Sequence, residues 1–218
     1  MTVAALYVQP NGAYAGVPGV DPWDAERDAR TYRGPHPVVA HPPCERWGRY
    51  WSGGPSARVR RLKGDDGGCF AAALWAVRTF GGVLEHPEAS HAWTWHGIAR
   101  PPRAGGWVQA DALGGWTCCV EQGHYGHRAR KATWLYAWGL EPPELRWGPS
   151  EGERLDEGFH SAEERRAARA AGRKPRPRLS TRENLATPPA FRDVLLAMAT
   201  TVAATGNCGS QASEPKAE

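Results

Sequence analysis

The segment between residues 37 and 87 constrains the fold more than any other part of the chain. Two short apolar runs, at 37–41 and 83–87, lead into proline-containing turns, Pro-Pro-Cys at 42–44 and Glu-His-Pro at 85–87. Between them, Gly67–Phe80 carries apolar residues on nearly every face, which predicts a mostly buried helix that ends at Gly81. Strand, helix and strand in this order predict a βαβ unit with two parallel strands.

Further strands and a final helix extend this unit. Apolar runs predict strands at Ala4–Val8, Thr117–Val120 and Thr133–Ala137, and a helix from Thr187 to about Ala204. The charged stretch Asp21–Arg33 is expected to form polar surface or a short helix, and residues 88–116, which lack periodicity, a long loop. With 26 Gly, 19 Pro and 11 Trp, the chain is expected to adopt an α/β fold with helices packed on a compact sheet and long loops rich in Trp, Gly and Pro.

Length and composition limit the class of protein. The 218 residues suit a single catalytic-like α/β domain over residues 1–204, with a basic, mobile insertion at 150–182 and a disordered tail at 205–218. No apolar run approaches the ~18 residues of a membrane-spanning helix, and the N-terminus lacks the pattern of a secretory signal. We therefore expect a cytoplasmic protein without a membrane partner. Its five cysteines lack framework spacing, so free thiols are expected.

Two reactive side chains follow the strands of the βαβ unit. Because parallel strands end at the same edge of a sheet, Cys44 and Glu85 are expected to emerge together. A cysteine is a nucleophile where its surroundings favour the thiolate, and His41, Arg46 and Arg49 lie close in sequence. A buried glutamate with a raised pKa would donate a proton. This pair suits thiolate addition to C6 of a pyrimidine, with the acid at N3 and C5 made nucleophilic.

The same residues also suit structural roles, which the sequence leaves open. Cys44 has the size of a small buried residue beside a tight turn, and Glu85 can anchor a loop by accepting backbone N–H groups. No zinc-binding spacing is present, so no metal is expected. Tryptophans flank the predicted site, where they can stack an extruded base or replace aliphatic core residues. They are Trp47, Trp51, Trp93, Trp95, Trp107 and Trp116.

Three short motifs follow one another along the chain. They are Val38-Val-Ala-His-Pro-Pro-Cys44, Val83-Leu-Glu-His-Pro87 and Gln122-Gly-His-Tyr-Gly-His-Arg-Ala-Arg-Lys-Ala-Thr-Trp134. In this order they resemble the motifs of phage-encoded relatives of DNA cytosine-C5 methyltransferases, over roughly residues 36–200. The resemblance implies a reduced Rossmann-like methyltransferase sheet, with Cys44 as the covalent nucleophile and Glu85 as the acid at N3. It implies a transferase that modifies cytosine C5 in DNA, in the host cytoplasm if a phage encodes it.

The third motif and a later basic run are the expected contacts to DNA or to a pyrimidine nucleotide. By the resemblance, Arg128 or Arg130 would contact the base carbonyl or a phosphate. The candidates for contact to the base or to DNA are Gln122, His124, Tyr125, His127, Arg128, Arg130 and Lys131. Charge in a hairpin turn is also ordinary solvated surface. From Ser161 a helix is expected to begin, and the eight basic residues within 165–182 form either a nucleic-acid footprint or a solvated linker.

The chain departs from the family pattern in two places. His86 stands where the family has Asn, and only 43 residues precede Cys44, where the family holds S-adenosylmethionine. The candidates for cofactor contact are Gly12, Gly16 and Asp21, with Asp24 and Asp28 as further acidic groups for a ribose. Two alternatives follow: C5 modification with another donor or on a free nucleotide, and a methyltransferase-like module that binds DNA without catalysis.

Overall fold

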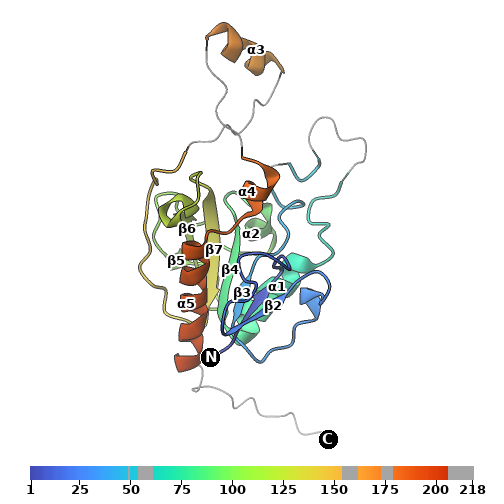
Figure 1. Ribbon diagram of the computed structural model, residues 1–218, viewed down its shortest axis with the longest axis vertical. Helices are drawn as coiled ribbons and strands as arrows, with labels where there is room; N and C mark the ends of the chain where they lie inside the picture. The colour runs from blue at the N-terminus through green and yellow to red at the C-terminus, as the bar shows by residue number, and fades with distance from the viewer. Residues whose placement is uncertain (49, 54–60, 154–161, 173–178, 206–218) are drawn as a thin grey trace, which may run out of the picture.

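One mixed sheet of seven strands organises the part of the chain that the structure describes. The computed structural model describes residues 1–48, 50–53, 61–153, 162–172 and 179–205. The strand order is β2-β1-β3-β4-β7-β6-β5, with β1 to β4 parallel and each of β7, β6 and β5 antiparallel to its neighbour (Figure 1). The strands are β1 Val3–Leu6, β2 Val20–Trp23, β3 Val38–Ala40, β4 Gly82–Pro87, β5 Val108–Gln109, β6 Trp116–Glu121 and β7 Ala132–Trp138.

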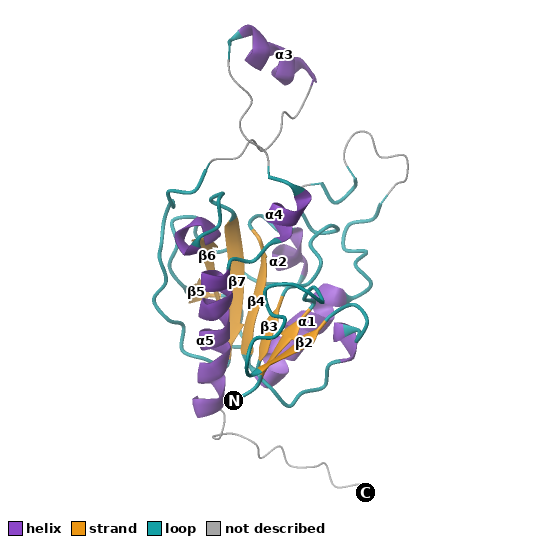
Figure 2. Cartoon of the chain, in the orientation of Figure 1, coloured by secondary structure: helices purple, strands orange, loops and turns teal. Residues whose placement is uncertain are grey.

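Helices cover both faces of this sheet. Because successive strand residues point to opposite faces, Ala4 and Leu6 pack with the residues of α1, whereas Val3 and Ala5 pack with those of α5. The two helices therefore lie on opposite sides of the strands (Figures 1 and 2). The helices are α1 Cys69–Phe80, α2 His91–Trp95, α3 Ala162–Ala170, α4 Thr181–Leu185 and α5 Pro189–Thr205, with short 3-10 turns η1 Ala29–Thr31 and η2 Gln122–Tyr125.

The predicted βαβ unit is present as β3, α1 and β4. Val38 is in register with Gly82, and Ala40 with Leu84, so the two strands are parallel neighbours. A Cβ atom at Gly82 would collide with the carbonyl of Val38, and the φ of Gly82 is 130°, so only glycine allows this close pairing. The α/β class, the strands near 117–120 and 133–137, and the helices from Ser161 and Thr187 also agree with the prediction.

Other elements differ from the sequence prediction. The stretch Asp21–Arg33 contains an edge strand, β2, as well as the short turn η1. The expected long loop at 88–116 contains α2 and the two-residue edge strand β5. Helix α4 was not predicted, although Ser180 and Glu183 form a capping box at its start.

Several expectations concern residues that the structure leaves undescribed. Of the predicted tail only Thr205 is described, and of the predicted insertion the ranges 154–161 and 173–178 are not. No helix in the described ranges is long and apolar enough to cross a membrane.

Candidate active site

Cys44 and Glu85 lie at the carboxyl edge of the parallel strands. Ala40 pairs with Leu84, so the next residues, His41 and Glu85, follow at the same level of the sheet. The Nδ1 atom of His41 is 2.9 Å from Oε2 of Glu85. Cys44 lies on the turn just beyond, half-buried, and its carbonyl accepts the N–H groups of residues 47 and 48. The parallel pairing of β3 and β4 thus brings both candidate catalytic residues to one edge.

The β6–β7 hairpin supplies further donors to Glu85. Nε2 of Gln122 and Oγ1 of Thr133 each lie 3.2 Å from Oε1 of Glu85. Gln122 Nε2 is also 2.9 Å from Thr133 Oγ1, and both side chains are fully buried. Gln122, predicted to contact the base or DNA, therefore binds the candidate catalytic carboxylate. Thr133 belongs to the third motif but was not among the candidate site residues.

The prediction that Glu85 has a raised pKa is wrong. Burial alone raises the pKa of this carboxyl, but the hydrogen bond from His41 and the positive charges of His41 and Lys131 outweigh burial. Together they lower the pKa to about 2. Glu85 is consequently a carboxylate at neutral pH, and it has to receive a proton before it can donate one.

A buried tyrosine extends the contacts of His41. The hydroxyl of Tyr14 is 2.7 Å from Nε2 of His41, and the two rings are 5.4 Å apart between centroids. Tyr14 is 3 % exposed and comes from the Gly-rich loop after β1. Burial, with a smaller contribution from the charge of Glu85, raises its pKa well above the usual value. No local sequence signal selects Tyr14, since its partner lies 27 residues away.

The thiol of Cys44 is neutral in these surroundings. Burial, and after it the charge of Glu85, raises its pKa, whereas Lys131 acts in the opposite direction. Among the basic residues expected to favour the thiolate, His41 binds Glu85 and Arg49 lies outside the described residues. Arg46 is described but is not among the charges that act on Cys44. Lys131, which directly precedes β7, is the described cation that favours thiolate formation.

Helix α4 is fixed against the third motif by three of the predicted contact residues. Nε2 of His127 lies 3.0 Å from the carbonyl oxygen of Glu183, and Nη1 of Arg128 lies 3.1 Å from its carboxylate. Nζ of Lys131 donates to the carbonyl of Ala186 over 2.8 Å. These contacts hold the segment 180–186 beside the candidate active site.

The remaining candidates of the third motif contact the segment 146–153. Nε2 of His124 lies 3.0 Å from the carbonyl oxygen of Gly148, and Nε of Arg130 lies 3.4 Å from that of Gly152. The hydroxyl of Tyr125 accepts the backbone N–H of Arg146, and its ring lies 5.3 Å from that of Phe191. In this structure these three side chains support the hairpin.

His86, which follows Glu85, is buried in an aromatic environment. Its ring stacks on Trp93 with centroids 6.1 Å apart and meets Phe70 edge-on at 5.3 Å. Both ring nitrogens are buried, and neither meets hydrogen-bond geometry with a described residue, although the carbonyl of Pro43 favours the charged form. Burial dominates and lowers the pKa of His86 to about 4.

A buried neutral histidine makes stability depend on pH. In the unfolded chain His86 is protonated below pH 6.5, whereas in the folded protein it stays neutral down to about pH 4. Its stabilisation is therefore complete above pH 6.5 and is lost between pH 6.5 and 4, by about 3 kcal/mol in total. We expect His86→Phe to remove this loss, measured by urea unfolding at pH 7 and pH 4.5. Equal pH dependence in both proteins would exclude His86 as its source.

A cavity of about 350 Å³ lies beyond the carboxyl ends of β1 and β2, where the strand order changes direction. Pro43, next to Cys44, forms part of its wall. Tyr7, another wall residue, has a φ of 61° and a buried hydroxyl without a hydrogen-bond partner among the described residues. The acidic wall residues are Asp24 and Asp28, and the candidates Gly12, Gly16 and Asp21 are not among the lining residues.

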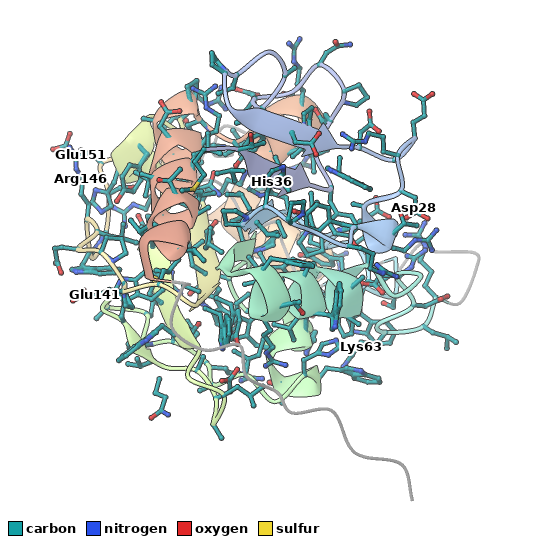
Figure 3. All side chains as sticks on the ribbon, turned by 90° about the horizontal axis from the view of Figure 1, so that it is seen from below. Asp28, His36, Lys63, Glu141, Arg146 and Glu151 are labelled. Atoms are coloured by element: carbon teal, nitrogen blue, oxygen red, sulfur yellow. The ribbon has the colours of Figure 1, made fainter. Side chains whose placement is uncertain are left out.

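A larger cavity, of about 500 Å³, lies between α5 and residues 141–146. Figure 3 shows Arg146, which lines it, and Asp28, which lines the first cavity, on opposite sides of the molecule. Among the tryptophans, Trp47 and Trp93 are core residues, whereas Trp95 is 63 % exposed. Within the described ranges no three His, Cys, Asp or Glu side chains are placed to bind a metal ion.

The chain was compared with protein-family models, with curated protein sequences and with solved structures. No family model, curated protein or solved structure matches it. Its function therefore has to be argued from the site itself.

Proposed function

We propose that this protein modifies a pyrimidine in DNA at C5, most simply cytosine, through a covalent bond from Cys44 to C6. The observation that carries the proposal is the pairing of a half-buried thiol and a buried carboxylate at the ends of two neighbouring parallel strands, with Lys131 acting on both. A thiol and a proton-transferring carboxyl are the two groups that activation of a pyrimidine ring requires.

The reaction proceeds in balanced steps. The Cys44 thiol first gives its proton to solvent, and the Glu85 carboxylate receives a proton. The Cys44 thiolate then adds to C6, the C5–C6 π pair moves into the C4–C5 bond, and the C4–N3 π pair moves to N3, which takes the proton from the Glu85 carboxyl. C5 of this enamine attacks an electrophile, whose leaving group departs with its bonding pair. A base then takes the C5 proton, and the freed bonding pair re-forms the C5–C6 double bond and expels the Cys44 thiolate. N3 returns its proton to the Glu85 carboxylate, which restores the ring. Because C6 is shielded in stacked DNA, the base has to leave the duplex first.

The fold supports a methyltransferase-like interpretation of this chemistry. From β1 the chain adds β2 on one side and β3 on the other, a change of direction typical of nucleotide-binding, Rossmann-like sheets. The 350 Å³ cavity lies at this point and reaches Pro43 beside the nucleophile. A donor bound there would lie next to the reacting base.

Two of the three acidic candidates, Asp21 and Asp28, do not fit S-adenosylmethionine in the way the resemblance implies. The third, Asp24, lines the cavity, and its Oδ1 atom accepts the backbone N–H groups of Glu26 and Arg27. Asp21 is held by Arg27 and by the indole N–H of Trp23, so it is not free to bind a ribose. Both carboxylate oxygens of Asp28 bind Arg30. Residues 7–19, all of them described, connect β1 to β2 without a helix, although the resemblance implies one. We therefore assign the electrophile only as a one-carbon or other small donor.

One assay separates these functions. The protein and labelled S-adenosylmethionine are incubated in parallel with a 5-fluorocytosine duplex and with ordinary DNA, because fluorine retains the C6 adduct once C5 has attacked the electrophile. A retained adduct together with label transfer supports a methyltransferase, whereas an adduct that forms without label transfer supports another donor. DNA binding with no adduct would overturn the proposed chemistry and leave the alternative of a binding module.

The basic residues within 165–178 are expected to contribute to DNA affinity. Seven Lys and Arg lie in this range without an acid, in a chain whose net charge is only +4. Replacing all seven by glutamine is expected to flatten the salt dependence of binding, by about 0.9 in the slope of log K against log salt for each phosphate that the variant no longer neutralises. Fluorescence anisotropy between about 50 and 200 mM salt measures this slope. An unchanged slope would identify the run as a solvated linker.

A further inference from the structure

We propose that Tyr14, His41 and Glu85 form a proton relay, in which His41 supplies the proton that Glu85 delivers to N3 of the pyrimidine. This inference rests on the proposed function. It makes His41 a positioning and proton-holding residue, in addition to the candidate catalytic pair Cys44 and Glu85.

The three side chains form one hydrogen-bonded line across three segments. Tyr14 comes from the loop after β1, His41 from the end of β3 and Glu85 from β4. The two hydrogen bonds measure 2.7 Å and 2.9 Å, and both imidazole nitrogens are used. The side chains of His41 and Glu85 are only 13 % and 12 % exposed, so bulk water has little access to the line. A carboxylate on one imidazole nitrogen fixes both the orientation of the ring and the position of its proton.

The acceptor positions of Glu85 show where the base can bind. An ionised carboxylate offers about four lone-pair positions. Gln122 and Thr133 use those of Oε1, and His41 uses one of Oε2. Among the described residues no donor uses the remaining position, which is on the same oxygen that receives the His41 hydrogen bond. A base nitrogen at that position would contact the same carboxylate oxygen that accepts the hydrogen bond from His41.

The relay solves a difficulty that the ionised carboxylate creates. Unprotonated N3 of cytosine is itself an acceptor, so it gains no proton from a carboxylate. As the Cys44–C6 bond forms, the Nδ1 proton of imidazolium His41 passes to Glu85, and the Glu85 proton passes to N3. Neutral His41 keeps its remaining proton on Nε2, which donates to the hydroxyl oxygen of Tyr14, and Nδ1 is recharged from solvent after turnover. No electrons are exchanged in the relay itself.

Titratable groups from several elements act on this line. Lys131 and His86 act on Glu85, and Glu85 itself acts on Cys44, as does Glu45 on the same turn. From α5, Arg192 and Asp193 act on Tyr14. Because these groups also act on the site, the variants that test the relay are confined to His41 and Tyr14.

The test is the rate of adduct formation at pH 7, measured under the conditions of the assay above together with the affinity for DNA. His41→Gln is expected to lower the rate by about 10²–10⁴-fold while DNA affinity stays the same. Tyr14→Phe, which keeps the pair of His41 and Glu85, should lower the rate by a smaller factor. His36→Gln is the matched control and should behave as the wild type. An unchanged rate in His41→Gln would overturn the relay.

A second measurement separates this inference from the proposed function. If the wild type forms no adduct, the proposed function fails, but the His41–Glu85 hydrogen bond is still measurable by NMR titration of the Glu85 carboxyl carbon. In the wild type Glu85 should stay ionised to about pH 2, and His41→Gln should raise its pKa. Titration of Glu85 at the same pH in both proteins would overturn the coupling. Should His41→Gln not fold, Tyr14→Phe tests the line through the imidazole nitrogen signals of His41.

Discussion

Replacing Cys44 by alanine is expected to abolish the covalent adduct with a 5-fluorocytosine duplex completely. Of the other described thiols, Cys118 and Cys119 are buried in β6, whereas Cys69, at the start of α1, lines the 350 Å³ cavity together with Pro43. The charge of Glu85 acts on Cys44 and is not among the charges that act on Cys69. Intact-mass analysis of the protein after incubation with the duplex measures the adduct. Because Cys44 is half-buried, Cys44→Ala is expected to change the unfolding free energy by less than about 1 kcal/mol.

The matched control for this experiment is Cys119→Ala. Cys119 is a buried thiol of the same chain, so the variant should keep the adduct and lose some stability. An adduct that survives in Cys44→Ala would remove Cys44 from the chemistry. A destabilisation of several kcal/mol in Cys44→Ala, together with a wild type that never forms an adduct, would identify Cys44 as a core residue.

Glu85→Gln is expected to have two separable effects. First, the amide cannot pass a proton, so adduct formation should slow by about 10²–10⁴-fold while DNA affinity stays the same. Second, the variant should lose the stabilisation that the ionised carboxylate provides. The pKa of Glu85 is about 2 in the folded protein and 4.5 in the unfolded chain.

The sign of the stability effect follows from these two values. Because the folded pKa is lower, the contribution of Glu85 is complete above pH 4.5 and disappears as the pH falls to about 2. Its size is about 3 kcal/mol at pH 7. Urea unfolding should therefore show Glu85→Gln less stable than the wild type at pH 7, with the difference shrinking below pH 4.5. A constant difference from pH 7 to pH 3 would contradict the ionised, hydrogen-bonded state of Glu85.

The βαβ unit could be predicted because its signals are local. Apolar runs of strand length, a buried helical pattern and the glycines at 81 and 82 define β3, α1 and β4 within one or two residues. Strand β2 lacks such signals. It contains Asp21 and Pro22, and it becomes a strand only because β1 pairs with it at the edge of the sheet.

The candidate site was predictable in position but not in charge state. The order of the elements brings Cys44 and Glu85 to one edge, which the sequence indicates. The low pKa of Glu85 depends on His41, 44 residues earlier, and on Gln122 and Thr133 of the hairpin. Burial alone predicts the opposite shift, and only the observed donors reverse it. The same distance in sequence explains why Tyr14 was not a candidate.

The two outer strands of the sheet limit how copies of this chain can associate. At one edge β2 has four residues and includes a proline, which cannot donate a backbone hydrogen bond, and at the other edge β5 has only two residues. Short edges interrupted by proline are poor templates for strand addition. A continuous sheet shared by two molecules is therefore disfavoured, which protects the described fold from edge-to-edge aggregation.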